Sequence, residues 1–309
     1  MKRFESLDGL GINACGLTIG SFDGLHIGHQ RIFQYLVEDS HKNNSQAVVL
    51  TFFPHPAEVL RGLSGPIYLT LGEEKNRILE DLGLDAVITV PFTREIAEIS
   101  AEEFMQKLVK QTNLRKMVIG YDFALGKNRQ GNPSRLSELG RTLGYEVEII
   151  SPVSYEGNPI SSTLIRTQIR AGLVDEAKAY LGRWFSIESN VSDGEKRGST
   201  LGYPTVNLPM DARQLLPANG VYATWLYHRG RKFASVTNIG FRPTFLPEQL
   251  KPLVETHIFD FNENLYGEKV RLDFVHFLRP EETYSSAAEL IAQMDKDSLL
   301  ARRILDNEE

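Results

Sequence analysis

Short apolar runs alternate with helical patterns through the first half of the chain, and this alternation limits the fold more than any other feature. Residues 17–22 form an apolar run typical of a buried strand, and apolar side chains within 32–37 recur at the spacing of one helix face. The alternation continues with strands predicted at 46–53, 86–92, 116–123 and 146–153 and helices predicted at 71–82, 100–111 and 133–143. Strands that alternate with helices pair in parallel and are covered on both faces. We therefore expect an α/β fold with a parallel sheet.

The second half of the chain has a different pattern. From Trp184 onward, runs rich in Val, Thr, Tyr and Phe follow one another, and turn residues separate them. These runs predict strands at 184–191, 221–228, 232–239, 254–261 and 269–278. A helical pattern covers residues 285–304. We expect a smaller antiparallel β-barrel domain with a C-terminal helix, so that the first domain spans 1–183 and the second spans 184–309.

The composition excludes several classes of protein. A chain of 309 residues that is 41% hydrophobic can bury a substantial core, and its length favours two domains. No apolar run approaches the roughly 20 residues that cross a bilayer, and the N-terminus is charged, so we expect a cytoplasmic protein without a membrane partner. The net charge of −6 argues against nucleic-acid binding. The single cysteine, Cys15, lies in an apolar stretch and is interpreted as a core residue.

A glycine-rich turn with two histidines follows the first predicted strand. Residues 20–29 read GSFDGLHIGH and lead directly into a helical pattern. The free N–H groups of a helix start attract an anion, and Gly24 and Gly28 let the backbone approach it. His26 and His29 would add side-chain donors. A turn whose histidines only cap the helix is the plain alternative, but the preceding strand and the two glycines favour a phosphate site.

Two further unusual segments fall at the ends of predicted strands. Residues 51–56 read TFFPHP, and residues 120–126 read GYDFALG. Ligands of parallel sheets bind at the carboxyl ends of the strands. We therefore expect these segments to converge with the histidine-containing turn on one cleft.

A second phosphate-type element opens a predicted helix near residue 162. Ser162 and Thr163 supply hydroxyl groups at the helix start, and Arg166 lies on the same face as Thr163. Taken alone, the hydroxyl groups are better explained by ordinary N-capping. Together with the histidines, these residues predict that two helix starts grip opposite sides of a triphosphate.

The motifs and their order resemble the prokaryotic bifunctional riboflavin kinase/FAD synthetase family. The resemblance spans nearly the whole chain and depends on segments 20–29, 51–56, 120–132, 160–166, 202–208, 219–222, 238–245, 255–261 and 265–267. It implies an N-terminal Rossmann-like nucleotidyltransferase domain that joins FMN to the AMP part of ATP, releasing pyrophosphate and making FAD. It also implies a C-terminal domain that phosphorylates riboflavin to FMN. Riboflavin, FMN and ATP would be the small-molecule partners, with Mg²⁺ as cofactor.

The resemblance implies roles for particular residues in the adenylyltransferase half. His26 and His29 would be catalytic, because they can stabilise charge on the phosphates during the transfer. The other residues expected to bind ATP or its phosphates are Gly20, Phe22, Asp23, Gly24, Gly28, Ser162, Thr163 and Arg166. Those expected at the flavin or nucleotide site are Phe53, His55, Pro56 and Asp122. For Phe53 and Pro56, a rigid loop packed on the core is an equal alternative.

In the kinase half, the resemblance makes Glu255 the base that faces the attacking hydroxyl of riboflavin. Thr205 and Asn207 match the positions that hold Mg²⁺, and together with Gly202 they would bind the nucleotide. Without the resemblance, an isolated strand carboxylate such as Glu255 is usually a solvated surface residue.

The chain departs from the family pattern at two positions of the kinase half. Val206 stands where the family usually has alanine, which predicts a tighter pocket, and Ser199 stands where arginine is common, which predicts weaker nucleotide binding. A chain in which only the adenylyltransferase works is therefore one alternative to a bifunctional enzyme. A flavin-nucleotide-binding regulator is another. The sequence leaves self-association open.

Overall fold

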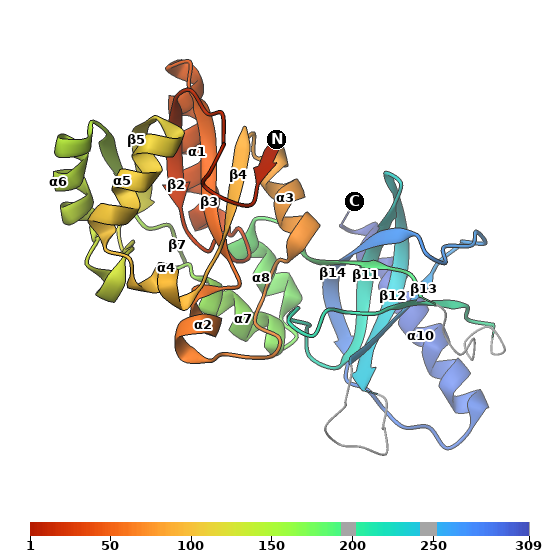
Figure 1. Ribbon diagram of the computed structural model, residues 1–309. Coiled ribbons are helices and arrows are strands. Elements are labelled where there is room, and N and C mark those ends of the chain that lie inside the picture. Colours follow the sequence, from red (N-terminus) through yellow and green to blue (C-terminus); the bar gives the residue numbers. More distant parts are fainter. Residues whose placement is uncertain (193–201, 242–251, 309) are drawn as a thin grey trace. The chain divides into compact units, whose positions relative to one another are not determined.

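The computed structural model describes residues 1–192, 202–241 and 252–308. The chain divides into two compact units (Figure 1). Unit 1 comprises Met1–Ser64 and Gly72–Ser161, and unit 2 comprises Gly65–Leu71 and Ser162–Glu309. The position of Ser199 lies outside the described residues.

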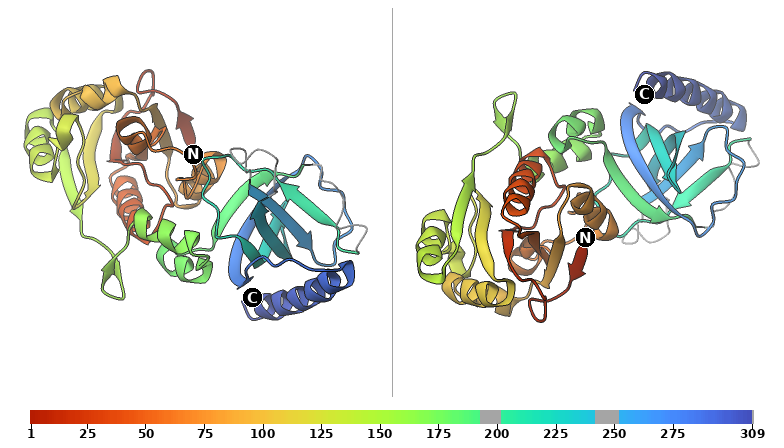
Figure 2. Two further views of the ribbon diagram at one scale, coloured as in Figure 1. Left: turned by 90° about the horizontal axis from the view of Figure 1, so that it is seen from below. Right: turned by 90° about the horizontal axis from the view of Figure 1, so that it is seen from above.

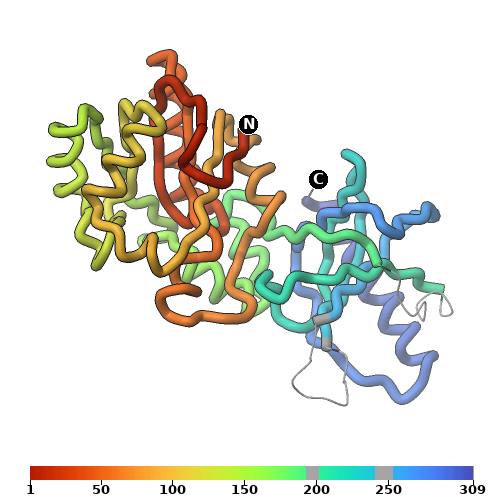
Figure 3. The backbone as a smooth tube through the Cα atoms, in the orientation of Figure 1, coloured from red at the N-terminus to blue at the C-terminus, as the bar shows by residue number. Residues whose placement is uncertain are grey.

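Unit 1, all of whose residues are described, contains the predicted parallel sheet. Its strand order is β1-β4-β3-β2-β5-β6, and every pairing is parallel. Figure 3 traces this unit from the red N-terminus to the yellow-green segments. The strands are β1 (Lys2–Phe4), β2 (Cys15–Ile19), β3 (Gln46–Phe53), β4 (Ala86–Pro91), β5 (Leu114–Gly120) and β6 (Glu146–Ile150).

Helices cover both faces of this sheet, as the alternation predicts (Figure 2). The first face packs against α1 (Ile27–Lys42) and α3 (Gly72–Asp81), and the second packs against α5 (Ala101–Thr112) and α6 (Pro133–Leu143). The shorter elements are α2 (Pro56–Arg61), α4 (Arg94–Glu98), the 3₁₀ turn η1 (Lys127–Arg129) and the hairpin of β7 (Ser154–Tyr155) and β8 (Asn158–Pro159).

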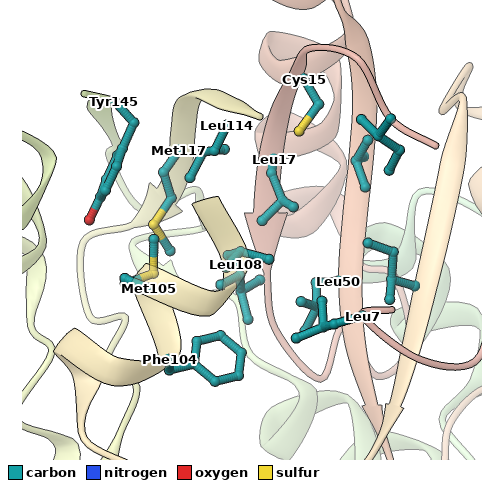
Figure 4. Packing of buried hydrophobic residues seen from close by; sticks show 14 of the residues in the cluster. Leu7, Cys15, Leu17, Leu50, Phe104, Met105, Leu108, Leu114, Met117 and Tyr145 are labelled. Carbon is teal, nitrogen blue, oxygen red and sulfur yellow. The ribbon is translucent and has the colours of Figure 1, made fainter. Parts of the chain in front are cut away.

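Cys15 belongs to the core of unit 1, as predicted. Figure 4 shows Cys15 among the apolar side chains between the sheet and α5, including Leu17 and Leu108. Its thiol is fully buried and donates to the carbonyl oxygen of Thr112 at 3.4 Å. Burial raises the pKa of the Cys15 thiol to about 12. The residue therefore stays protonated and packs as a small apolar side chain.

Unit 2 contains an antiparallel sheet with the strand order β10-β13-β12-β11-β14-β9 among its described residues. A bridge between Ser192 and Asn207 connects the two edges of this sheet, because the Ser192 N–H donates to the Asn207 carbonyl oxygen at 2.9 Å. The sheet therefore curls into a half-barrel, in agreement with the predicted small β-barrel domain. The strands are β9 (Phe185–Asn190), β10 (Thr205–Leu208), β11 (Gly220–His228), β12 (Arg231–Phe241), β13 (Pro252–Ile258) and β14 (Lys269–Arg279).

The described residues of unit 2 include three helices. The C-terminal helix α10 (Ala287–Asp306) packs Ala301 and Leu305 against Trp225 of the sheet. The other two, α7 (Ser162–Arg170) and α8 (Val174–Leu181), lie before residue 183 in the chain but cluster with the barrel. Residue 183 as the functional boundary between the two activities stays a prediction.

Candidate functional site

The turn between β2 and α1, residues 20–29, brings the two predicted histidines together. We call it the histidine turn. His26 is the N-cap of α1, and its Nδ1 accepts a hydrogen bond from the backbone N–H of His29 at 3.3 Å. The two imidazole rings stack with their centroids 3.5 Å apart. Because Nδ1 of His26 is an acceptor, the neutral ring carries its proton on Nε2 and can donate from there.

Packing inside the histidine turn explains two of its glycines and its phenylalanine. A Cβ atom at Gly20 would lie 2.8 Å from the ring of Phe22, and one at Gly28 would lie 3.1 Å from the ring of His26. The buried Phe22 ring contacts the His29 ring edge-on, with centroids 5.1 Å apart. The Phe22 ring therefore packs against His29. A direct contact of the Phe22 side chain with ATP stays a prediction.

His29 has an unusual electrostatic environment. Its Nδ1 atom is buried and has no hydrogen-bond partner among the residues that the structure describes. Burial holds the pKa of His29 well below its ordinary value, and the nearby charges of His26 and Lys75 add to this effect. Buried polar atoms normally have a partner, so the unpartnered nitrogen of His29 is an unusual feature of the histidine turn.

Lys75 is a residue of this region that the sequence analysis missed. It extends from α3, and its ammonium group donates to the carbonyl oxygen of Ser21 at 2.6 Å and to the hydroxyl of Thr51 at 2.9 Å. Burial lowers the pKa of Lys75 to about 8, although the carboxylate of Asp23 partly offsets the effect. The sequence could have indicated this position, because Lys75 lies three residues before Ile78 and therefore on the face of α3 that packs into the core.

A cavity of about 640 Å³ begins at the histidine turn, within unit 1. It lies at the carboxyl ends of the strands, as predicted, and we call it the aromatic cavity. Its lining includes residues at or just after the ends of β2, β3, β4 and β5, namely Gly20, Ser21, Phe52, Phe92, Asp122 and Phe123. The rings of Phe52 and Phe92 meet edge to face, with centroids 5.3 Å apart. An apolar wall of this kind suits a flat ring system.

The predicted segment 51–56 contributes unevenly to the aromatic cavity. His55 and Pro56 line it, whereas Phe53 is not part of its lining. His55 also caps α2, since its Nδ1 accepts from the backbone N–H of Ala57 at 3.1 Å. The segment is therefore a rigid capped turn, as one interpretation of the sequence expected. It also forms a wall of the cavity, as the other interpretation expected.

The second phosphate-type element lies in unit 2. Ser162 begins α7, and Thr163 and Arg166 follow within it. The Nε of Arg166 donates to the carbonyl oxygen of Ile67 at 2.6 Å, so the guanidinium group is anchored to segment 65–71 of the same unit. The convergence of these three residues with His26 and His29 on one triphosphate stays a prediction.

The register of the barrel strands groups the predicted kinase residues on one face. Asn207 pairs with Glu255 across β10 and β13, and Glu255 pairs with Asn238 across β13 and β12. Residues that pair directly point to the same face, so Glu255 lies between two amide side chains. Thr205 lies two residues before Asn207 and shares this face. We call Thr205, Asn207, Glu255 and Asn238 the kinase row. The sequence analysis included Asn238 only as the first residue of segment 238–245 and predicted no role for it.

The neighbours of the kinase row bear on the expectation for Val206. Val206 pairs with the buried Thr256, on the opposite face from Asn207. Its additional bulk therefore lies on the face opposite the kinase row, and the expected tightening of the pocket stays a prediction. Gly202 lies in the turn before β10 with a φ of 86°, a conformation that favours glycine.

Comparison with known proteins identifies the family. Residues 12–164 match the family model for FAD synthetase, and residues 181–305 match the one for riboflavin kinase. The bifunctional riboflavin kinase/FMN adenylyltransferase of Buchnera aphidicola subsp. Schizaphis graminum is 35% identical, with 93% of each chain covered. The chain belongs to this bifunctional family. The Escherichia coli K12 member is also 35% identical, over 93% of this chain and 92% of its own.

A solved structure supports the same fold over the whole chain. The crystal structure of a protein named macrolide-efflux protein from Streptococcus pneumoniae is 30% identical and superimposes with a TM-score of 0.88. The match covers 97% of this chain and 98% of that one. The comparisons confirm the predicted fold and the class of bifunctional flavin kinase and adenylyltransferase. No helix within the described part of the chain is long and apolar enough to span a membrane.

Proposed function

We propose that the histidine turn and the aromatic cavity of unit 1 form the adenylyltransferase site. The main support is that the turn with the two stacked imidazoles contributes Gly20 and Ser21 to the lining of an aromatic-walled cavity at the carboxyl ends of the strands. The helix start and the imidazoles suit the phosphates of ATP, and the cavity suits the flavin ring of FMN. The names of the related enzymes include riboflavin and FMN, and the aromatic cavity offers a place for such a flavin ring.

The transfer in unit 1 needs no covalent intermediate with the protein. A phosphate oxygen of FMN attacks the α-phosphorus of ATP, the bond from that phosphorus to the bridging oxygen breaks, and pyrophosphate leaves with the electron pair. His26 and His29 donate hydrogen bonds to the oxygens on which charge develops. Backbone groups at Gly20, Asp23, Gly24 and Gly28 hold the phosphates. Asp122, which lines the aromatic cavity, accepts from a hydroxyl or N–H group of the bound substrates. A role of Ser162, Thr163 and Arg166 in binding the phosphates of ATP stays a prediction.

The kinase row of unit 2 is proposed to phosphorylate riboflavin. Glu255 accepts the proton of the ribityl 5′-hydroxyl while that oxygen attacks the γ-phosphorus of ATP, and ADP leaves. Asn207 and Asn238 flank Glu255 in the strand register, and the side-chain amide of Asn238 donates to Glu281 at 3.3 Å. Gly202 gives the nucleotide access to the start of β10.

Magnesium is the proposed cofactor of the kinase row. The hydroxyl of Thr205 and the amide oxygen of Asn207 are hard oxygen donors on one face, so they fit a cation that keeps several of its waters. Bound there, Mg²⁺ would neutralise charge on the phosphates of ATP. Among the described residues, no group of three or more His, Cys, Asp or Glu side chains forms an alternative site. A cytoplasmic location and the lack of nucleic-acid partners stay predictions.

One assay tests the proposed function. The purified chain is incubated with ATP and Mg²⁺ and either riboflavin or FMN, and the flavins are separated by chromatography. We expect FMN followed by FAD from riboflavin, and FAD alone from FMN. Formation of FAD from FMN but no FMN from riboflavin would support the adenylyltransferase-only alternative. Flavin binding without either product would support a regulator.

A further inference from the structure

The ammonium group of the partly buried Lys75 connects three elements beside the histidine turn. Lys75 of α3 donates both to the Ser21 carbonyl oxygen, which follows β2, and to the Thr51 hydroxyl near the end of β3. Thr51 in turn donates to the same carbonyl oxygen at 3.3 Å. Thr51 is only 3% exposed. Taking a lysine out of water is costly, so its presence here calls for a reason beyond filling space.

The backbone of the histidine turn needs such a restraint. Phe22 and Leu25 adopt positive φ angles of 43° and 45°, a region that residues other than glycine rarely occupy. Strained residues of this kind persist only where the surroundings hold them. Lys75 and Thr51 fix Ser21, the residue directly before Phe22, and Phe22 contacts the ring of His29. The position of His29 is therefore linked to the ammonium group through a short series of contacts.

A neutral side chain could provide similar hydrogen bonds, but Lys75 also contributes a positive charge. The charged or titratable groups that interact with it are Asp23 in the histidine turn and His29 in α1. Asp23 is 4% exposed and offsets part of this charge. In a site for a triphosphate, a fixed cation behind the turn attracts the ligand without blocking it.

We propose that Lys75 is a positioning residue of the adenylyltransferase site. Its ammonium group joins the Ser21 carbonyl oxygen to the Thr51 hydroxyl, and in this way it holds the histidine turn in the shape that presents His26 and His29 to the phosphates of ATP. This inference rests on the proposed function of unit 1.

The test replaces Lys75 by methionine, which keeps the length of the side chain and removes its donors and charge. Lys107→Met is the matched control, because Lys107 is an exposed lysine of α5 in the same unit. We measure kcat and KM for FAD formation from FMN and ATP, and riboflavin phosphorylation in the same preparations. We expect Lys75→Met to lower kcat for FAD about 50-fold, since a small displacement of catalytic groups has effects of this size.

The split between kinetic constants separates positioning from general damage. For Lys75→Met we expect KM for FMN and the kinase rate to stay within about two-fold of the wild-type values, as for Lys107→Met. Unchanged kcat for FAD overturns the inference. A rise in KM for FMN in proportion to the loss of kcat also overturns it, because it shows a distorted unit.

Thr51 provides a second test that does not depend on the folding of the Lys75 variant. Thr51→Ser keeps the hydroxyl group and should retain the wild-type kcat, whereas Thr51→Val removes it and should lower kcat for FAD about ten-fold. Equal activities of the two Thr51 variants overturn the inference. A wild-type chain that forms no FAD from FMN would contradict the proposed function of unit 1 and this inference with it.

Discussion

Glu255 lies in the middle of the kinase row, so a single atom exchange can isolate its role. Glu255→Gln keeps the shape of the side chain between Asn207 and Asn238 but removes the carboxylate that accepts the proton. We expect riboflavin phosphorylation to fall about 10²- to 10⁴-fold, as is usual on loss of a general base. Conversion of supplied FMN to FAD should not change. Chromatography of parallel reactions started from riboflavin and from FMN measures both, and an equal loss would contradict separate sites.

The lowered pKa of Lys75 predicts a pH dependence of FAD formation but not of riboflavin phosphorylation. Because burial lowers its pKa to about 8, the ammonium group faces Asp23 and His29 below this pH and is neutralised above it. The positive charge beside the histidine turn is then lost as the pH rises. We expect kcat for FAD formation to decline above about pH 8, and this decline to be missing in Lys75→Met.

The control for this pH dependence is the kinase activity of the same samples. Ser21 and Thr51, which accept hydrogen bonds from the Lys75 ammonium group, both belong to unit 1. Riboflavin phosphorylation should therefore show no decline that the Lys75→Met substitution removes. A decline of FAD formation that persists unchanged in Lys75→Met would assign the titrating group elsewhere.

The junction of β2 and α1 shows where a secondary-structure pattern stops being informative. The apolar run predicted a strand over 17–22, whereas β2 ends at Ile19. Phe22 and Leu25 are apolar like strand residues, but both take positive φ angles in the histidine turn. The ring of Phe22 then packs against the rings of His29 and Phe33. No local pattern encodes this, since the contact of Phe22 with Phe33 exists only once α1 has formed.

Gly20→Ala tests whether the packing of this turn matters for catalysis. The added Cβ would meet the Phe22 ring at 2.8 Å, so the ring must move and its contact with His29 must change. We expect unit 1 to lose about 1–3 kcal/mol of stability, a typical cost of overpacking. FAD formation should fall while FMN formation stays. Thermal melting and the two flavin assays measure these effects, and a wild-type rate of FAD formation would show that the turn tolerates the shift.

The strands were more predictable than the assignment of segments to the two units. Strand β3 covers 46–53 as predicted, because a continuous apolar run identifies a strand that is buried on both faces. β1 was missed because it has three residues and is defined by pairing with β4 at the sheet edge. Segment 65–71 belongs to unit 2 through contacts such as the one from Gln214 to the Tyr68 carbonyl oxygen, 146 residues away in the chain.

The sequence likewise predicted only part of the candidate site. Motif spacing predicted His26 and His29 because their residue types carry recognisable chemistry, whereas Glu255 was predicted only through the family resemblance. Lys75 and Asn238 were not singled out because their roles depend on partners from other elements. The grouping of Asn207 with Glu255 likewise required the register of two strands that lie 48 positions apart, as the pairing of residues 207 and 255 shows.

The chain as a whole should bind two nucleotides, one in each unit. His26 and His29 belong to unit 1, whereas Thr205 and Asn207 belong to unit 2, so each set can be removed without touching the other. Calorimetric titration of the wild-type chain with a non-hydrolysable ATP analogue and Mg²⁺ should give a stoichiometry of about two. His29→Ala and Asn207→Leu should each reduce it to about one, with loss of FAD formation in the first variant and of FMN formation in the second.

A control variant at a second histidine and the removal of Mg²⁺ complete this titration experiment. His41→Ala is the control for His29→Ala, because His41 is a partly exposed histidine of the same helix that pairs with Asp85. It should keep both sites and both activities. Chelation of Mg²⁺ by EDTA should abolish FMN formation, since the phosphates of ATP then face Glu255 without a neutralising cation. A single site in the wild-type chain, lost equally in His29→Ala and Asn207→Leu, would mean that the two activities share one nucleotide.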